Sequence, residues 1–441
     1  MSSYVQISQR DFNEPHESSP ELSDTRPSRH GLFRIYWLTA IVCCGGILFG
    51  YDSGVIGGVL TFDSFLRDFH CTPELQTRVS AIAVGIQQAG ALVGCLAIWF
   101  LTNRQGRRHA MMYSSAIFCA GVIFEVINSH SLPVFYLGRV ICGLGIGGSA
   151  TVIPIYLSEM SPKDIRARLG SCYQFTFTIG ILVSYWVDYG IQFRSPTPAQ
   201  WQIPLVLQLI PGALMGLGML TLDESVRWLL SKGNAPRAWT SLVWIRASDA
   251  PEVAAEFAQI KQAIEADRHS TADFRLTELL AWPNARRLLL GISLFLAQQS
   301  TGATAMAYFG PQFFALLVGD TGNSHSLTLL LTGFFGVLKV TSCLAFIIWV
   351  ADRFGRRPLL VSGAMAMSIC MLSTSFIAPS PTSSNNAATT TTSTSISTSG
   401  ILTITLIYLN ITAYNLLGGA HFPGPLQASS STAASVNQAS Q

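Results

Sequence analysis

Apolar residues are grouped along this chain in long blocks, and short polar segments separate the blocks. A helix that crosses about 30 Å of hydrocarbon needs roughly 20 residues, and ten blocks are close to that length. The pattern therefore predicts an all-α polytopic membrane protein with about ten spanning helices. The predicted spans are residues 37–59, 79–101, 109–128, 133–157, 169–191, 204–221, 286–316, 327–350, 358–378 and 400–418.

Composition supports a membrane protein and argues against an enzyme. The chain has 441 residues, of which 49% are hydrophobic and only 12% are charged, with a mean hydropathy of +0.39. The nine cysteines include no CxxC pair, and most lie in apolar blocks, where they are expected to act as small core residues. Because no nucleophile–base arrangement, metal cluster or phosphate loop is visible, we expect no enzymatic activity, no cofactor, no metal and no nucleic-acid partner.

A short basic loop occurs twice between apolar blocks. One copy is Asn103–Arg108 and the other is Asp352–Arg357, and the two begin 249 residues apart. A duplicated membrane unit is a common architecture of secondary transporters, in which the substrate path lies between the halves. The repeat therefore predicts two related helical bundles rather than a solvated basic patch.

The predicted organisation has five parts. A second half that matches the first requires six helices, but only about four are visible, so the last two are predicted to be missing. The parts are a disordered cytosolic tail (1–34), a first six-helix bundle (35–221), a cytosolic helical linker domain (222–285), a partial second bundle (286–418) and an aberrant polar tail (419–441).

Basic residues predict the orientation of the chain in the membrane. Lys and Arg concentrate in the loops after the second, fourth and eighth spans, and the intervening loops contain fewer of them. Cytosolic loops carry such an excess, so the amino terminus is predicted to be cytosolic. Within the linker, residues Pro251–Arg268 are expected to form a helix. The Ser- and Thr-rich stretch 379–399 is expected to be a flexible external loop.

Asp52 lies inside the first apolar span. A carboxylate in such a place is costly and by default marks an ion or proton pathway with a nearby partner. The best candidate partner is Arg139, near the start of the fourth span, so the pair is predicted to couple protonation to movement. The alternative is a carboxylate at a helix end that faces external water.

Several motifs, in this order, resemble those of the sugar porters of the major facilitator superfamily, and especially fungal hexose and quinate permeases and related glucose sensors. The resemblance implies a major facilitator fold of twelve helices in two bundles, an intracellular helical domain and alternating access. The motifs are Gly50-Tyr51-Asp52, Gly138-Arg139, Pro154–Met160, Gln298–Gly302 and Asp352–Arg357.

The same resemblance implies a substrate site. Gln174, Gln298 and Gln299 would bind sugar hydroxyls, because a neutral amide both donates and accepts hydrogen bonds. Thr304 stands where the family usually has an asparagine that contacts the sugar, and Tyr308 would belong to the external gate. A single buried glutamine can instead hold helices together, and the adjacent pair favours substrate binding.

The resemblance also implies a cytosolic latch of charged residues, which would pair while the site faces outward. Such pairs bias an equilibrium between two conformations through their different contacts in each. The predicted members are Arg104, Arg107, Glu159, Arg166, Glu224, Arg227, Asp352, Arg353 and Arg357.

Lys339 lies within the eighth span. It could bind an anionic substrate such as quinate. Alternatively, its side chain could extend to the membrane–water interface or pair with an acidic residue, and these two interpretations together are favoured.

The sequence as a whole predicts transport of a monosaccharide, most readily a hexose, by proton symport across the fungal plasma membrane. The expected partners are the sugar, the proton and the lipid bilayer. Two alternatives are a nutrient receptor that does not transport, and an inert fragment whose second bundle exposes packing faces to lipid.

Overall fold

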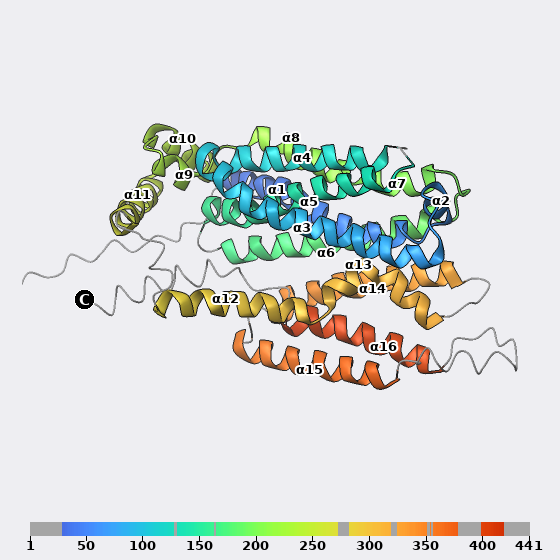
Figure 1. Ribbon diagram of the computed structural model, residues 1–441. Coiled ribbons are helices and arrows are strands. Elements are labelled where there is room, and N and C mark those ends of the chain that lie inside the picture. The colour runs from blue at the N-terminus through green and yellow to red at the C-terminus, as the bar shows by residue number, and fades with distance from the viewer. Residues whose placement is uncertain are drawn as a thin grey trace, which may run out of the picture.

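The structure is a computed structural model, and every regular element in it is a helix (Figure 1). This result confirms the all-α prediction for the part of the chain that the structure describes. The described residues are 29–127, 130–162, 165–271, 282–318, 324–350, 353, 356–377 and 398–418. Residues 1–28, Asp352, most of the predicted loop 379–399 and the tail 419–441 lie outside these ranges.

The first group of helices forms one bundle. In it α1 packs against α6, and α5 packs against both α3 and α4. Its elements are α1 (Arg29–Val59), α2 (Asp63–Asp68), α3 (Pro73–Gln105), α4 (Arg107–Val126), α5 (Leu132–Met160), α6 (Arg166–Ile191), α7 (Ala199–Leu207), α8 (Leu209–Gly218) and the 3₁₀ turn η1 (Met219–Thr221).

Glycines allow α1 and α6 to approach backbone to backbone. A Cβ atom added at Gly50 would lie 2.9 Å from the carbonyl carbon of Phe177, and one added at Gly180 would lie 2.8 Å from the backbone nitrogen of Tyr51. Without a hydrophobic driving force between helices in lipid, such close van der Waals packing is a main source of association. The pairing of α1 with α6 therefore depends on these two glycines.

Three helices follow the first bundle and lie at one end of it, which we call the linker end (Figure 1). They are α9 (Val226–Ser231), α10 (Ala235–Arg246) and α11 (Pro251–Thr271), and only α11 was predicted. The other two begin at polar caps: Ser225 accepts a hydrogen bond from the Trp228 N–H, and Asn234 accepts one from the Arg237 N–H. Such caps satisfy backbone donors that a helix start leaves free, so they define short helices that apolar length cannot reveal.

The first helix starts at Arg29, earlier than the predicted tail boundary at residue 34. Arg34 explains part of this extension. Its Nη1 atom donates to the Trp244 carbonyl oxygen at 2.5 Å, and its guanidinium lies 5.4 Å from the centre of the Trp244 ring. This contact holds the start of α1 against α10.

The second group of helices lies beside α6 and α1 (Figure 1). Gly302 has a φ of +74° and separates α12 from α13, so the predicted span 286–316 is two helices. The elements are α12 (Trp282–Ser300), α13 (Ala303–Val318), α14 (Ser324–Ala345), the π-helical turn η3 (Phe346–Val350), α15 (Arg356–Ile377), α16 (Thr398–Ala413) and the π-helical turn η4 (Tyr414–Gly418).

Eight helical stretches in the described part of the chain are long and apolar enough to cross a membrane. All ten predicted spans are helical, but those at 169–191 and 286–316 are not among the eight. The first of these is α6, with 26 residues, and the second is divided at Gly302 into α12, with 19 residues, and α13, with 16.

The two bundles meet at the end opposite the linker, which we call the α2 end. Here α6 contacts α14, and α1 contacts α13. Hydrogen bonds cross the boundary from Tyr185 Oη to the Ala307 carbonyl at 2.7 Å and from Gln312 Nε2 to Ser80 Oγ at 2.9 Å. The contact is close, because a Cβ atom added at Gly57 would lie 2.6 Å from the Tyr308 carbonyl oxygen.

Candidate functional site

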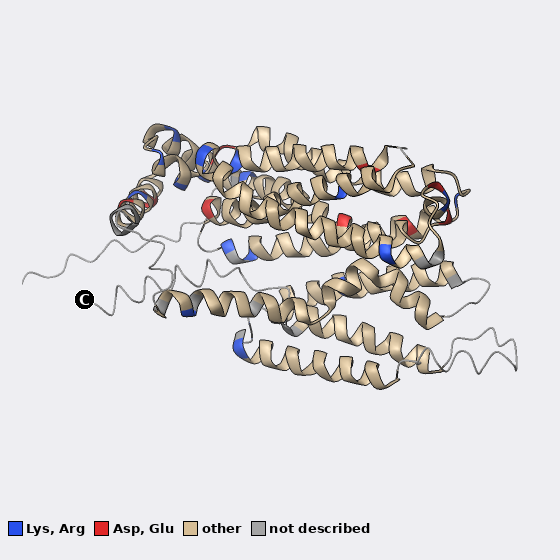
Figure 2. Ribbon diagram, viewed as in Figure 1, with Lys and Arg blue, Asp and Glu red and all other residues tan. Residues whose placement is uncertain are grey.

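A group of fully buried charges occupies the interior of the first bundle. Arg139 Nη1 on α5 donates to Asp52 Oδ1 on α1 at 3.0 Å, so the structure brings together the two residues that the sequence paired. Neither side chain is exposed to solvent. Figure 2 shows how rare charge is along the bundle helices compared with the linker helices. A charge pair this deep is costly unless both partners are well satisfied.

Two amides complete this buried network. Gln87 on α3 donates its Nε2 to Asp52 Oδ2 and accepts from Arg139 Nη2 at its Oε1. The same guanidinium also lies 3.4 Å from Glu125 Oε1 on α4, and Gln208 Nε2 donates to the other oxygen of Glu125 at 3.2 Å. One cation is therefore shared by two carboxylates, and a single additional proton would make the group neutral.

Local sequence explains how the guanidinium reaches this position. A Cβ atom added at Gly138 would lie 2.7 Å from the Glu125 backbone nitrogen, and one added at Gly143 would lie 3.0 Å from the Ala91 backbone nitrogen. These glycines let α5 approach α4 and α3 closely on either side of Arg139. The side chain is consequently enclosed by both neighbouring helices.

Sequence reasoning missed several members of the site. Glu125 lies inside a predicted span, so the rule that identified Asp52 would also have identified it. The same rule applies to Asp188 on α6, which is 1% exposed and whose two carboxylate oxygens accept no hydrogen bond from a described residue. Nothing in the local pattern singled out Gln87 or Gln208, because their partners are distant in sequence.

Three of the five predicted substrate residues form hydrogen bonds around the break at Gly302. Gln298 Nε2 donates to Tyr414 Oη at 3.1 Å, which joins the end of α12 to η4. Thr304 Oγ1 donates to Gln299 Oε1 at 2.7 Å across the break at Gly302. Sequence reasoning did not identify Tyr414.

Tyr308, which the sequence assigned to the external gate, lies at the boundary between the bundles. Its hydroxyl is 2.7 Å from Gln88 Nε2 and 3.1 Å from Ser53 Oγ, and its side chain is buried. Ser53 directly follows Asp52, so this tyrosine connects the second bundle to the segment that carries the buried charge. Gln174 is half-buried on α6.

At the linker end, part of the predicted latch is assembled. Arg107 Nε and Nη2 donate to the two carboxylate oxygens of Glu159, each at 3.0 Å. Glu224 Oε1 accepts from the backbone N–H of Arg107 at 2.8 Å and from that of Ser225 at 2.9 Å. Burial raises the pKa of Glu224, and the backbone N–H groups oppose that rise.

The other predicted latch residues are not joined to this group. Arg166 Nη2 donates to the Ser161 carbonyl at 3.3 Å, and Asp352 lies outside the described residues. Four arginines are exposed and form no ion pair with another described residue: Arg104, Arg227, Arg353 and Arg357.

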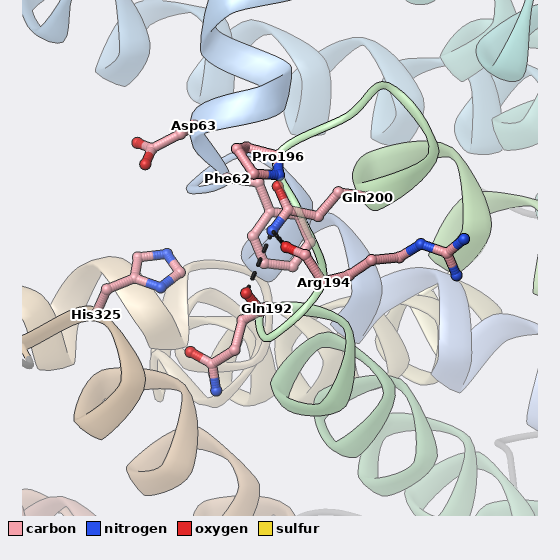
Figure 3. A pocket seen from close by; sticks show the side chains of 7 residues that line it. All are labelled: Phe62, Asp63, Gln192, Arg194, Pro196, Gln200 and His325. Atoms are coloured by element: carbon pink, nitrogen blue, oxygen red, sulfur yellow. Dashed lines mark hydrogen bonds between the residues drawn. The ribbon is translucent and has the colours of Figure 1, made fainter.

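A pocket of about 170 Å³ is present at the α2 end (Figure 3). None of the predicted substrate residues lines it. One wall is His325, whose Nε2 lies 3.2 Å from the Thr61 carbonyl oxygen. The lining residues are Phe62, Asp63, Gln192, Arg194, Pro196, Gln200 and His325.

The described residues contain no group of three or more His, Cys, Asp or Glu side chains that could hold a metal ion.

Comparison with solved structures identifies the class. The proton:xylose symporter XylE bound to 6-bromo-6-deoxy-D-glucose superposes with a TM-score of 0.71 at 25% identity, over 90% of this chain and 81% of that one. The inward-open conformation of XylE from E. coli superposes with a TM-score of 0.64 at 23% identity, over 87% and 80% of the two chains. The protein therefore has the fold of the major facilitator superfamily, as the sequence predicted.

Sequence comparison identifies the family. The profile of the sugar (and other) transporter family matches residues 38–422. The quinate permease of Emericella nidulans is 34% identical over 88% of this chain and 74% of its own length. A probable quinate permease of Aspergillus niger is 38% identical over 77% of this chain and 65% of its own length. The chain belongs to the sugar porter family of the major facilitator superfamily, and it is a multi-pass membrane transport protein, not an enzyme.

Proposed function

We propose that this chain carries a polyhydroxylated solute of monosaccharide size across the membrane by alternating access, coupled to protons. The observation that carries the proposal is the ion pair of Asp52 with Arg139, which is 3.0 Å long and fully buried. Intramembrane ionisable groups of this kind mark proton relays in transporters.

The composition of the buried group supports proton coupling. With both carboxylates ionised, Asp52 and Glu125 outnumber the single cation Arg139. A proton on Asp52 removes its attraction for the guanidinium, which then retains Glu125 as its partner. The two protonation states favour different contacts across α1, α4 and α5, and such a difference is what shifts a conformational equilibrium.

Recognition of the solute is assigned to Gln174, Gln298, Gln299 and Thr304, with Tyr308 at the external gate. Amide and hydroxyl groups suit a polyol because each can donate and accept. The names of the relatives support this substrate class: one is a quinate permease, another is a probable quinate permease, and XylE is a proton:xylose symporter. The predicted hexose belongs to the same range of sizes and hydroxyl patterns.

We place the amino terminus and the linker helices in the cytosol, and the protein in the plasma membrane. The arginine-rich loops lie at the linker end, which supports this orientation. Arg107, Glu159 and Glu224 would then form the first-bundle part of the cytosolic latch, and Arg353 and Arg357 would join them when the site faces outward.

Uptake by cells that express this chain tests the proposal. We expect accumulation of labelled solute against its gradient when the outside is acidic, with glucose, xylose and quinate tested separately. Asp52→Asn should abolish accumulation and retain exchange of solute between the two sides. Asp249→Asn is a matched control, because Asp249 is exposed in the linker. Unchanged pH-driven accumulation in the Asp52 variant would overturn proton coupling through this residue.

A further inference from the structure

The second bundle contains a buried lysine that the proposed mechanism does not use. Lys339 on α14 is 4% exposed, although it lies near the middle of the continuous helical stretch Ser324–Val350. Its Nζ atom is 5.5 Å from the centre of the Phe177 ring on α6. A cationic side chain at this depth requires a compensating partner.

Neither common explanation for an intramembrane lysine applies here. The side chain does not extend to the membrane surface, since it is buried and far from both ends of its helix. No described carboxylate lies within ion-pairing distance of its amine. The contact with Phe177 is a cation–π interaction, which recovers only a small part of the cost of removing an ammonium from water. The reading favoured by the sequence, that Lys339 reaches the interface or pairs with an acid, therefore does not hold within the described chain.

Phe177 links Lys339 to the elements that carry the residues assigned to substrate recognition. It lies where α14 meets α6, at the boundary between the two bundles. Phe177 packs against the same apolar cluster that contains Tyr414, and Tyr414 accepts the hydrogen bond from Gln298. Gln174 lies about one helical turn before Phe177 and hence on the same face of α6.

We propose that Lys339 binds the carboxylate of the transported solute, so that the preferred substrates are polyhydroxylated carboxylic acids. The inference rests on the transport function proposed above and specifies its substrate class. Hydroxyl groups of such a solute would bind the amides, and its carboxylate would supply the anion that Lys339 lacks. A charge-assisted hydrogen bond in a site shielded from water is among the stronger polar contacts that a protein can offer.

The same chemistry predicts discrimination against neutral sugars. A neutral solute would fill the site and leave the ammonium desolvated without an anion. Sites that present a buried polar group strongly reject analogues that cannot pair with it, because the unpaired group carries its full desolvation cost. Lys339 is thus a specificity-determining residue.

Binding to the purified chain in lipid nanodiscs tests this inference. The probes are quinate and D-gluconate as acids, and D-glucose and D-xylose as neutral solutes. The wild-type chain should bind the acids at least about tenfold more tightly than the neutral solutes. Lys339→Met should lose most of that ratio, and Lys339→Arg should keep part of it, because the charge remains.

Lys232→Met is the matched control. Lys232 also lies over an aromatic ring, 5.9 Å from the centre of Trp228, but it is exposed in the linker. This variant should keep the full preference for acids. Size-exclusion chromatography checks that each variant is folded. If Lys339→Met is not folded, the ratio of acid to neutral-solute affinity in the wild-type chain tests the inference by itself.

Three results would overturn the inference, and the first two can be told apart from the third. Equal or tighter binding of the neutral sugars by the wild-type chain, or a ratio that Lys339→Met leaves unchanged, would overturn the role of Lys339 and leave the transport proposal intact. Failure to bind or transport any of the four solutes would overturn the proposed function together with this inference.

Discussion

The two bundles differ in how they accommodate buried charge. In the first, Arg139 is held between Asp52 and Glu125, and the amides of Gln87 and Gln208 satisfy the remaining oxygens. In the second, Lys339 faces an aromatic ring and no described acid. The first bundle therefore fixes its cation internally, whereas the second leaves its cation available to a solute. Under the two proposals above, proton coupling would belong to the first bundle and recognition of a substrate charge to the second.

The bundles also differ in how closely their helices pack at glycines. In the first bundle, a Cβ atom added at Gly180 would lie 2.8 Å from a backbone nitrogen. Among the second-bundle glycines with described surroundings, the closest approach is at Gly336, where an added Cβ atom would lie 3.1 Å from the Tyr185 ring. Helices of the first bundle therefore approach one another more closely at several of their glycines.

The largest effect is expected from removal of the cation in the first bundle. Arg139→Leu leaves two carboxylates buried without their partner, and breaking a buried ion pair costs about 3–5 kcal/mol. The free energy of unfolding should fall by that amount in detergent, or the variant should fail to accumulate. Arg353→Leu, at an exposed position after η3, should change it by less than about 0.5 kcal/mol. Equal stability of both variants would contradict the contrast between the bundles.

The contribution of close α1–α6 packing to stability can be tested by a glycine-to-alanine substitution, which adds one methyl group. Gly50→Ala places a Cβ atom against the Phe177 backbone, and overpacking of this kind costs about 1–3 kcal/mol. Gly85→Ala, on α3, meets nothing within 4 Å and should be neutral or slightly stabilising. Thermal unfolding of the two variants under identical conditions gives the comparison. A stable Gly50 variant would show that α1 and α6 can separate without loss.

The ion pair at the linker end should give a smaller effect. A double-mutant cycle of Arg107→Ala and Glu159→Ala should yield a coupling free energy of about 0.5–3 kcal/mol, since the pair is bidentate and mostly buried. The cycle of Arg357→Ala with Glu159→Ala should yield a coupling near zero in the same conformation. Coupling in the second cycle would mean that the second bundle already participates in the latch.

The smallest effect concerns the pH dependence of stability. The pKa of Glu224 is raised above the ordinary value of 4.5, so the folded chain binds more protons than the unfolded chain between the two values. The free energy of unfolding should therefore fall as the pH rises through that interval. Glu224→Gln should show a shallower fall when thermal unfolding is followed from pH 4 upward. An identical slope would exclude Glu224 as its source.

The sequence by itself determined where the membrane-spanning helices lie and that Asp52 pairs with Arg139. Lengths of apolar residues located all ten predicted spans as helices, because a bilayer imposes a minimum length on any chain that crosses it. The rule that intramembrane charges need partners joined Asp52 to Arg139, and the structure places them 3.0 Å apart. Motif order was sufficient to assign the family.

Only the tertiary structure decided which residues complete the buried charge network and the candidate substrate site. Gln87 and Tyr414 have polar side chains that local sequence cannot distinguish from helix-packing residues, and their roles depend on helices far away in the chain. The environment of Lys339 is likewise set by α6, through Phe177. Apolar length is a property of one segment and can be read locally, whereas a buried contact exists only after separate segments have packed together.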